Sequence, residues 1–209
     1  MTKRLGSWIL LSLLLLTPFP GEASIDVPDS AMSTGAETDD GPRVEARLLV
    51  DVSAVAPGDT FRAGVLFNMQ PEWHIYWRNQ GQSGLPTHVT FEGPGLVAAP
   101  LQWPAPEVFS ANNGFIVTYG YDTETLLFSA MTLSDDANGE VEITANIDYL
   151  ACAVSCIPGR ATLTRTLPIG AETLTAPTET VLLFESFCGG RNFLGILSFR
   201  HGCGHSRRG

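Results

Sequence analysis

Apolar and polar residues alternate along two neighbouring stretches of the chain, 141–149 and 160–167. In the first stretch the odd-numbered positions carry the apolar residues, which are Val141, Ile143, Ala145, Ile147 and Tyr149. This period of two predicts a pair of β-strands that each bury one face. Because few residues separate the two stretches, we expect a hairpin whose tip is formed by Ala153, Val154 and Ser155.

The alternation also predicts how the strands of this hairpin pair. With that tip, Cys152 lies opposite Cys156 and Asp148 lies opposite Arg160, so that opposite charges meet across the strands. Arg165 is the one residue that breaks the pattern on the buried side. Both cysteines share the polar parity, which predicts an exposed pair outside the core. Directly opposed Cβ atoms lie about 4.5–5.5 Å apart, so a small adjustment would allow a disulfide to close.

Short stretches with the same kind of pattern recur between Val44 and this hairpin. They cover residues 44–52, 61–67, 73–78, 88–91, 96–99, 115–118 and 126–133. Turn signals rich in Gly, Pro, Asn and Asp separate them, and no long helical period interrupts the series. The pattern predicts an all-β fold, a single β-sandwich domain over residues 43–169.

The two ends of the chain differ in composition from this middle part. Residues 1–23 combine a basic start with an apolar run too short to span a bilayer, which predicts a signal peptide. Residues 24–42 read as a flexible acidic leader. Residues 170–209 are predicted to form a linker and an irregular tail. The tail is explained either by a truncated or frameshifted reading of the gene or by a genuine short form of the protein. In that tail, Cys188 and Cys203 are either unpaired or bridged to each other.

Charge narrows the classes of partner. Residues 24–187 contain six arginines, no lysine and 21 acidic residues, a net charge of −15. Such a surface repels nucleic acid and anionic membranes. We therefore expect protein partners with neutral or basic docking faces, and we exclude nucleic acid as a partner.

The close cysteine pair has two interpretations on chemistry alone. A signal peptide would place it in an oxidising compartment, where a disulfide is stable. As a structural clip in a non-catalytic binding module it would close a loop of only five residues, which contributes about 2 kcal/mol. Accessible disulfides are also the ones suited to thiol exchange. Both interpretations stay open at this point.

Four segments of the chain resemble one known family. They are 73–86, 103–107, 118–121 and 148–159, and the last contains Cys152-Ala-Val-Ser-Cys156-Ile-Pro. In this order they are similar to the N-terminal periplasmic domain of the DsbD thiol:disulfide interchange proteins, especially its ScsB-like branch. The resemblance implies an immunoglobulin-like β-sandwich with a redox-active cysteine pair.

The resemblance also implies a pathway for electrons. The pair Cys152 and Cys156 would receive them from a membrane-embedded thiol donor and pass them to periplasmic thioredoxin-like or disulfide-isomerase proteins. The resemblance implies a periplasmic location and, if the chain is active, exchange of the protein-disulfide reductase type. It also implies a link to cytochrome c biogenesis and full-length relatives that are anchored in the inner membrane. In the family an aromatic cap loop shields the reduced pair, and the candidates here are Phe115, Tyr119 and Tyr121.

Several ionisable residues are candidates for tuning the thiols. Arg160 would favour a thiolate at close range, whereas Asp148 and Glu107 would disfavour it or shuttle a proton. His74 and His88 have no ligand partners at a recognisable metal spacing. We therefore predict no metal and no small-molecule cofactor, and read both histidines as ordinary surface or core residues.

Overall fold

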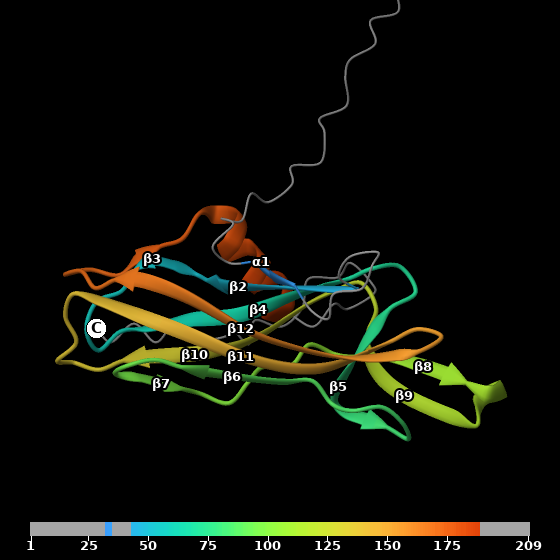
Figure 1. Ribbon diagram of the computed structural model, residues 1–209. Helices are drawn as coiled ribbons and strands as arrows, with labels where there is room; N and C mark the ends of the chain where they lie inside the picture. The colour runs from blue at the N-terminus through green and yellow to red at the C-terminus, as the bar shows by residue number, and fades with distance from the viewer. Residues whose placement is uncertain (1–31, 35–42, 189–209) are drawn as a thin grey trace, which may run out of the picture.

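The computed structural model describes residues 32–34 and 43–188, and most of them lie in β-strands of two sheets (Figure 1). The first sheet has five antiparallel strands in the order β1-β2-β4-β10-β7. Their bounds are β1 Met32–Thr34, β2 Val44–Val50, β4 Thr60–Met69, β10 Glu124–Leu133 and β7 Leu96–Ala98. This sheet forms the face of the sandwich that carries the C-terminal helix.

The second sheet has six strands and contains the cysteine hairpin. Its order is β12-β11-β5-β9-β8, and β6 pairs with β11 as well. Their bounds are β12 Cys156–Pro168, β11 Glu140–Cys152, β5 His74–Gly81, β9 Ile116–Tyr121, β8 Glu107–Ala111 and β6 His88–Glu92. A small third sheet joins β3 (Val52–Ala54) to β13 (Leu174–Thr175). The turn between β8 and β9 is a short 3-10 helix, Asn112–Gly114.

β11 changes its neighbour along its length. It pairs with β6 from Thr144 to Asp148, and then with β5 at Ala151 and Cys152. The cysteine end of β11 is therefore next to β5, although β5 is far from it in the sequence.

The longer predicted strands bury one face in the core between the two sheets. The alternating residues of β11 from Val141 to Tyr149 are all buried, as the sequence pattern predicts. Arg165, the exception to that pattern, is half-buried opposite Ile143, and burial lowers the pKa of its guanidinium. The fold is the predicted all-β, immunoglobulin-like sandwich.

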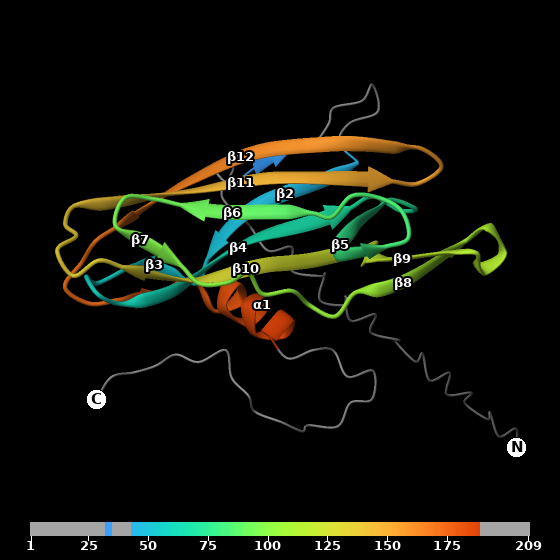
Figure 2. The same ribbon diagram turned by 90° about the horizontal axis from the view of Figure 1, so that it is seen from below.

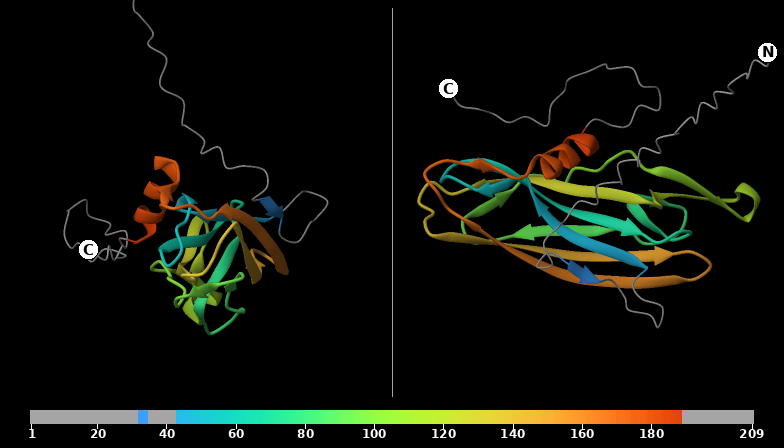
Figure 3. Two further views of the ribbon diagram at one scale, coloured as in Figure 1. Left: turned by 90° about the vertical axis from the view of Figure 1, so that its left-hand side faces the viewer. Right: turned by 90° about the horizontal axis from the view of Figure 1, so that it is seen from above.

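Residues beyond the predicted domain boundary form a helix, α1 (Thr178–Cys188), on the outer face of the first sheet (Figures 2 and 3). The carbonyl of Pro177 accepts hydrogen bonds from the amides of Thr180 and Val181, and proline is well suited to a helix start. Phe184 and Phe187, almost one turn apart, are buried with a second apolar cluster of Leu49, Leu66, Leu126 and Phe128. The expectation of an irregular tail was wrong here because this spacing gives the segment an apolar face.

Parts of the expected leader and linker also join the sheets. Met32–Thr34 pairs with β2, and Leu174–Thr175 pairs with β3, so neither segment is wholly loop. The predicted signal peptide and Cys203 lie outside the described residues. Among residues 43–188, no helix has the length and apolar character needed to cross a bilayer.

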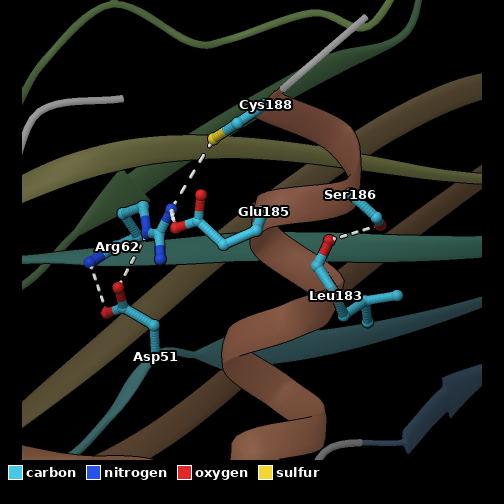
Figure 4. A network of polar contacts seen from close by, with 6 residues as sticks. All are labelled: Asp51, Arg62, Leu183, Glu185, Ser186 and Cys188. Carbon is cyan, nitrogen blue, oxygen red and sulfur yellow. Dashed lines mark hydrogen bonds and ion pairs between the residues drawn. The ribbon is translucent and has the colours of Figure 1, made fainter. Parts of the chain in front are cut away.

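A buried arginine connects the first sheet to α1 (Figure 4). Arg62 Nε lies 2.7 Å from Asp51 Oδ2, and the backbone amide of Arg62 donates to Asp51 Oδ1 at 2.7 Å. Arg62 Nη1 lies 2.8 Å from Glu185 Oε1 and 3.6 Å from Cys188 Sγ on the helix. The Arg62 and Asp51 side chains are only 6% and 2% exposed, so this ion pair is shielded from solvent. The contacts of Arg62 with Glu185 and Cys188 link the helix to the sheet.

Gly64 of β4 makes room for α1, because a side chain there would fill the space beneath Phe184. An added Cβ would lie 2.8 Å from Phe128 Cβ and 3.1 Å from Phe184 Cε1. We expect Gly64→Ala to lower the free energy of unfolding by about 1–3 kcal/mol through overpacking. Urea denaturation followed by fluorescence measures this change. Gly170→Ala, where the nearest atom would be 3.5 Å away, is the control and should change stability little.

Candidate functional site

The cysteine pair closes the tip of the β11–β12 hairpin. The register is the predicted one, with Cys152 opposite Cys156, Asp148 opposite Arg160 and Ile147 opposite Ala161. Cys152 and Cys156 form a disulfide with Cα atoms 4.1 Å apart. Figures 1 and 2 show this tip at the same end of the sandwich as the β8–β9 hairpin. The site thus lies at one end of the second sheet.

The two sulfurs of the pair have different surroundings. Cys156 is exposed, whereas Cys152 is only 1% exposed. The prediction that both cysteines would be exposed was therefore wrong for Cys152. Parity correctly placed it on the face opposite the core, since Ala151 packs in the core cluster. That outer face is covered at this point by neighbouring aromatic residues, so it is not open to solvent.

His74 is the direct cross-strand neighbour of Cys152 in the β5–β11 pairing. Directly opposed residues project from the same face of a sheet, so the imidazole lies beside Cys152. The ring of His74 stacks on Phe109 of β8, with centroids 4.7 Å apart and an angle of 26° between the planes. Tyr76 meets it edge-on at 5.1 Å. His74, Tyr76 and Phe109 form the aromatic cluster of the site.

Burial within this cluster shifts the pKa values of its polar members. Desolvation lowers the pKa of His74 below its usual 6.5, against a smaller raising effect from the Asp122 carboxylate. Desolvation also raises the pKa of the Tyr76 phenol. At neutral pH the imidazole is therefore uncharged and can accept a proton.

The three cap candidates do not lie over the pair. Phe115 is 78% exposed, directly after the turn of the β8–β9 hairpin. Tyr119 packs edge-on against Trp77 at 6.5 Å. Tyr121 pairs with Ile75, packs in the core, and donates a hydrogen bond from its hydroxyl to the Pro104 carbonyl. Because Tyr121 lies on the core side of the sheet, it does not shield the cysteines.

Two of the three candidates for tuning the thiols form an ion pair with each other. Arg160 Nε lies 2.6 Å from Asp148 Oδ1, and both side chains are largely exposed. The two charges offset each other in solvent, so neither acts strongly on the cysteines. Glu107 is exposed and pairs with Gly120 in the β8–β9 register. None of the three is the direct neighbour of Cys152.

Sequence reasoning missed His74 and Phe109 as members of the site. The strand around His74 was predicted, but no local signal tells which strand it pairs with. The described residues contain no group of three or more His, Cys, Asp or Glu side chains placed to hold a metal ion. The arrangement can support one kind of chemistry, which is exchange at a disulfide with one exposed sulfur and one sulfur buried beside an imidazole.

Among solved structures, the chain is similar to the N-terminal periplasmic domain of ScsB from Proteus mirabilis, with a TM-score of 0.50 and 18% identity over 75% of this chain and 57% of that chain. It is also similar to the DsbD N-terminal domain of Neisseria meningitidis in the reduced form, with a TM-score of 0.34 and 13% identity over 61% of this chain and 89% of that chain. The chain thus spans a little over half of the ScsB domain's length. No curated protein matches the sequence.

A family model gives the most specific of these matches. The model described as thiol:disulfide interchange protein DsbD, N-terminal, matches residues 45–168. That range covers most of the sandwich and the whole cysteine hairpin, and it exceeds half of the chain. The chain therefore belongs to the family of DsbD N-terminal domains.

Proposed function

We propose that this domain is a periplasmic thiol:disulfide interchange module that passes reducing equivalents to partner proteins through Cys152 and Cys156. The observation that carries the proposal is the asymmetric disulfide at the hairpin tip, with Cys156 exposed and Cys152 buried. Thiol exchange needs one sulfur that a partner can reach and a second that completes the exchange within the molecule.

The exposure of the two sulfurs supports the roles that we propose for them. In the reduced domain the Cys156 thiolate attacks a partner disulfide, forms a mixed disulfide and releases one partner thiolate. Cys152 then attacks the Cys156 sulfur, closes the intramolecular disulfide and releases the second partner thiolate. The pair loses two electrons and the partner gains them. A thiol donor reverses both steps on the domain, again by attack at Cys156.

A purely structural clip is the alternative function. The hairpin is already held by continuous pairing from Glu140 opposite Pro168 to Ala151 opposite Ile157. A disulfide that closes so small a loop at the end of this ladder adds only about 2 kcal/mol in the chain-entropy model. The position is therefore better suited to exchange than to stabilisation.

Charge and family indicate the partners that we propose. The strongly acidic surface between residues 24 and 187 favours proteins with neutral or basic docking faces. Family membership supports a membrane-embedded thiol protein as the electron donor. Periplasmic thioredoxin-like or disulfide-isomerase proteins, including those of cytochrome c biogenesis, are the proposed acceptors. The predicted signal peptide at residues 1–23 would deliver the domain to the periplasm.

The reduction potential of the Cys152–Cys156 pair tests the proposed function. We expect a value of roughly −120 to −270 mV, the range of known exchange proteins. The measurement equilibrates the chain with glutathione or dithiothreitol buffers, traps free thiols and counts them by mass. Replacing Cys188 and Cys203 with serine in the measured chain leaves Cys152 and Cys156 as its only cysteines. A potential well below roughly −300 mV would identify a structural disulfide and reject exchange.

A further inference from the structure

The resolving step of the proposed exchange requires a proton to leave a buried thiol. In the mixed disulfide Cys156 is bonded to the partner, and Cys152 carries a free thiol that is shielded from solvent. Burial in apolar surroundings raises a thiol pKa, and only the thiolate attacks. Some group beside Cys152 must therefore take its proton if the step is to be fast near pH 7.

Within the described part of the chain, the strand pairing places two residues directly opposite Cys152, and these are its disulfide partner Cys156 on β12 and His74 on β5. Facing residues of this kind have Cβ atoms about 4.5–5.5 Å apart, within reach of an imidazole. Stacking on Phe109 from one side and the edge of Tyr76 from another hold the ring in place. The ring is therefore positioned on β5 before the mixed disulfide forms.

The charged groups around His74 do not outweigh the effect of burial, which favours the uncharged ring. Asp122, just after β9, is the carboxylate that acts on it, and its effect is smaller than that of burial. On β5 itself, Arg78 lies over the ring of Trp77 at 4.8 Å. On β8, Glu107 shares the parity of Phe109 but is exposed to solvent. A neutral imidazole in this setting is a proton acceptor at pH 7.

We propose that His74 accepts the proton of the Cys152 thiol in the step in which Cys152 attacks the mixed disulfide at Cys156. In this step the Cys152–Cys156 bond forms and the bond from Cys156 to the partner sulfur breaks. The proton passes from Cys152 to a ring nitrogen of His74, and from there to water or to the departing thiolate. The inference rests on the proposed exchange function and adds a residue to it.

The size of the effect follows from thiol ionisation. Even a thiol with an ordinary pKa of about 8.5 is only about 3% ionised at pH 7, so complete deprotonation would accelerate attack about 30-fold, and more for a thiol whose pKa is raised by burial. We expect loss of the imidazole to slow the resolving step about tenfold at pH 7. The difference should vanish as the pH rises past the pKa of the Cys152 thiol, where the thiol ionises without help. Below the lowered pKa of His74 the protonated ring no longer helps, so the wild-type advantage should also disappear there.

The test mixes the reduced full chain with dithiobis(nitrobenzoate) in a stopped-flow instrument and follows the thionitrobenzoate that is released. Reaction with dithiobis(nitrobenzoate) releases one equivalent when Cys156 is modified and a second when Cys152 resolves the adduct. Every sample carries serine at positions 188 and 203, so that only the pair reports. The variants are His74→Phe, which keeps a ring to stack on Phe109, and His74→Gln, which keeps a polar group.

His88→Phe is the matched control, because His88 is the other histidine paired with β11, exposed and opposite Asp148. It should leave both phases unchanged. We expect both His74 variants to slow only the second phase, by a factor that falls to one at high pH. A slowing that is equal at all pH values, or no slowing, would reject the role of His74. A wild-type chain that releases no second equivalent would instead reject the exchange function itself.

Discussion

A chain in which Cys152 is replaced by serine should accumulate a mixed disulfide at Cys156 and proceed no further. The exposed sulfur still reacts with a partner, but the buried sulfur that would displace the partner is gone. Tethered attack has an effective concentration far above that of millimolar external thiols, so release of the partner should slow by about 10³-fold or more. Incubation of the reduced variant with oxidised glutathione, followed by intact-mass analysis, measures the adduct.

The reciprocal variant is the control for this experiment. Cys156→Ser removes the exposed sulfur and leaves only the buried Cys152, so we expect little adduct on the same timescale. Equal amounts of stable adduct in both variants would contradict the assigned roles. Serine at positions 188 and 203 in both chains leaves one cysteine in each, at position 156 or at position 152.

Replacing Arg62 with methionine should cause the largest loss of stability. The change leaves the Asp51 carboxylate, which is 2% exposed, with no cation beside it. Breaking a buried pair by removing one partner typically costs about 3–5 kcal/mol, because an uncompensated charge stays buried. Methionine keeps an apolar stem beneath Phe184, which isolates the effect of the charge. Urea denaturation measures the change in the free energy of unfolding.

Arg160→Met tests whether this loss depends on burial. Arg160 also pairs with an aspartate, Asp148, but both side chains are largely exposed. Exposed pairs contribute only about 0–1 kcal/mol, so this variant should unfold almost as the wild type does. Losses of similar size in the two variants would contradict the structural role of the buried pair.

The local pattern of apolar and polar residues predicted the register of the cysteine hairpin correctly. Its strands are close in sequence, and the alternation from Val141 to Tyr149 allows only one register that buries the apolar face. The same reasoning predicted the sandwich, because the longer strands, such as β2, β4, β10 and β11, each have a buried face. Helix α1 was missed because the linker before it, rich in Thr, Ala and Pro, concealed the apolar spacing of Phe184 and Phe187.

The site was predicted only where it depends on local structure. Cys152 and Cys156 are near neighbours, so the sequence was enough to pair them. Cys152 is paired with His74, and His74 in turn stacks on Phe109, and both of these residues come from strands that are distant from Cys152 in the sequence. No period or turn signal identifies such neighbours, and the aromatic candidates chosen from the sequence, Tyr119 and Tyr121, belong to the other face. The surroundings of the sulfur therefore required the structure.

The packed domain extends beyond the residues that match the family, because helix α1 packs on the first sheet. The match stops at residue 168, but residues 178–188 cover Leu49, Leu66, Leu126 and Phe128 on the outer face of the first sheet. A fragment that ends at residue 168 would expose these side chains together as one apolar patch. Exposed apolar patches of this kind promote aggregation. Solubility of the isolated domain is thus set by a segment outside the residues that define its family.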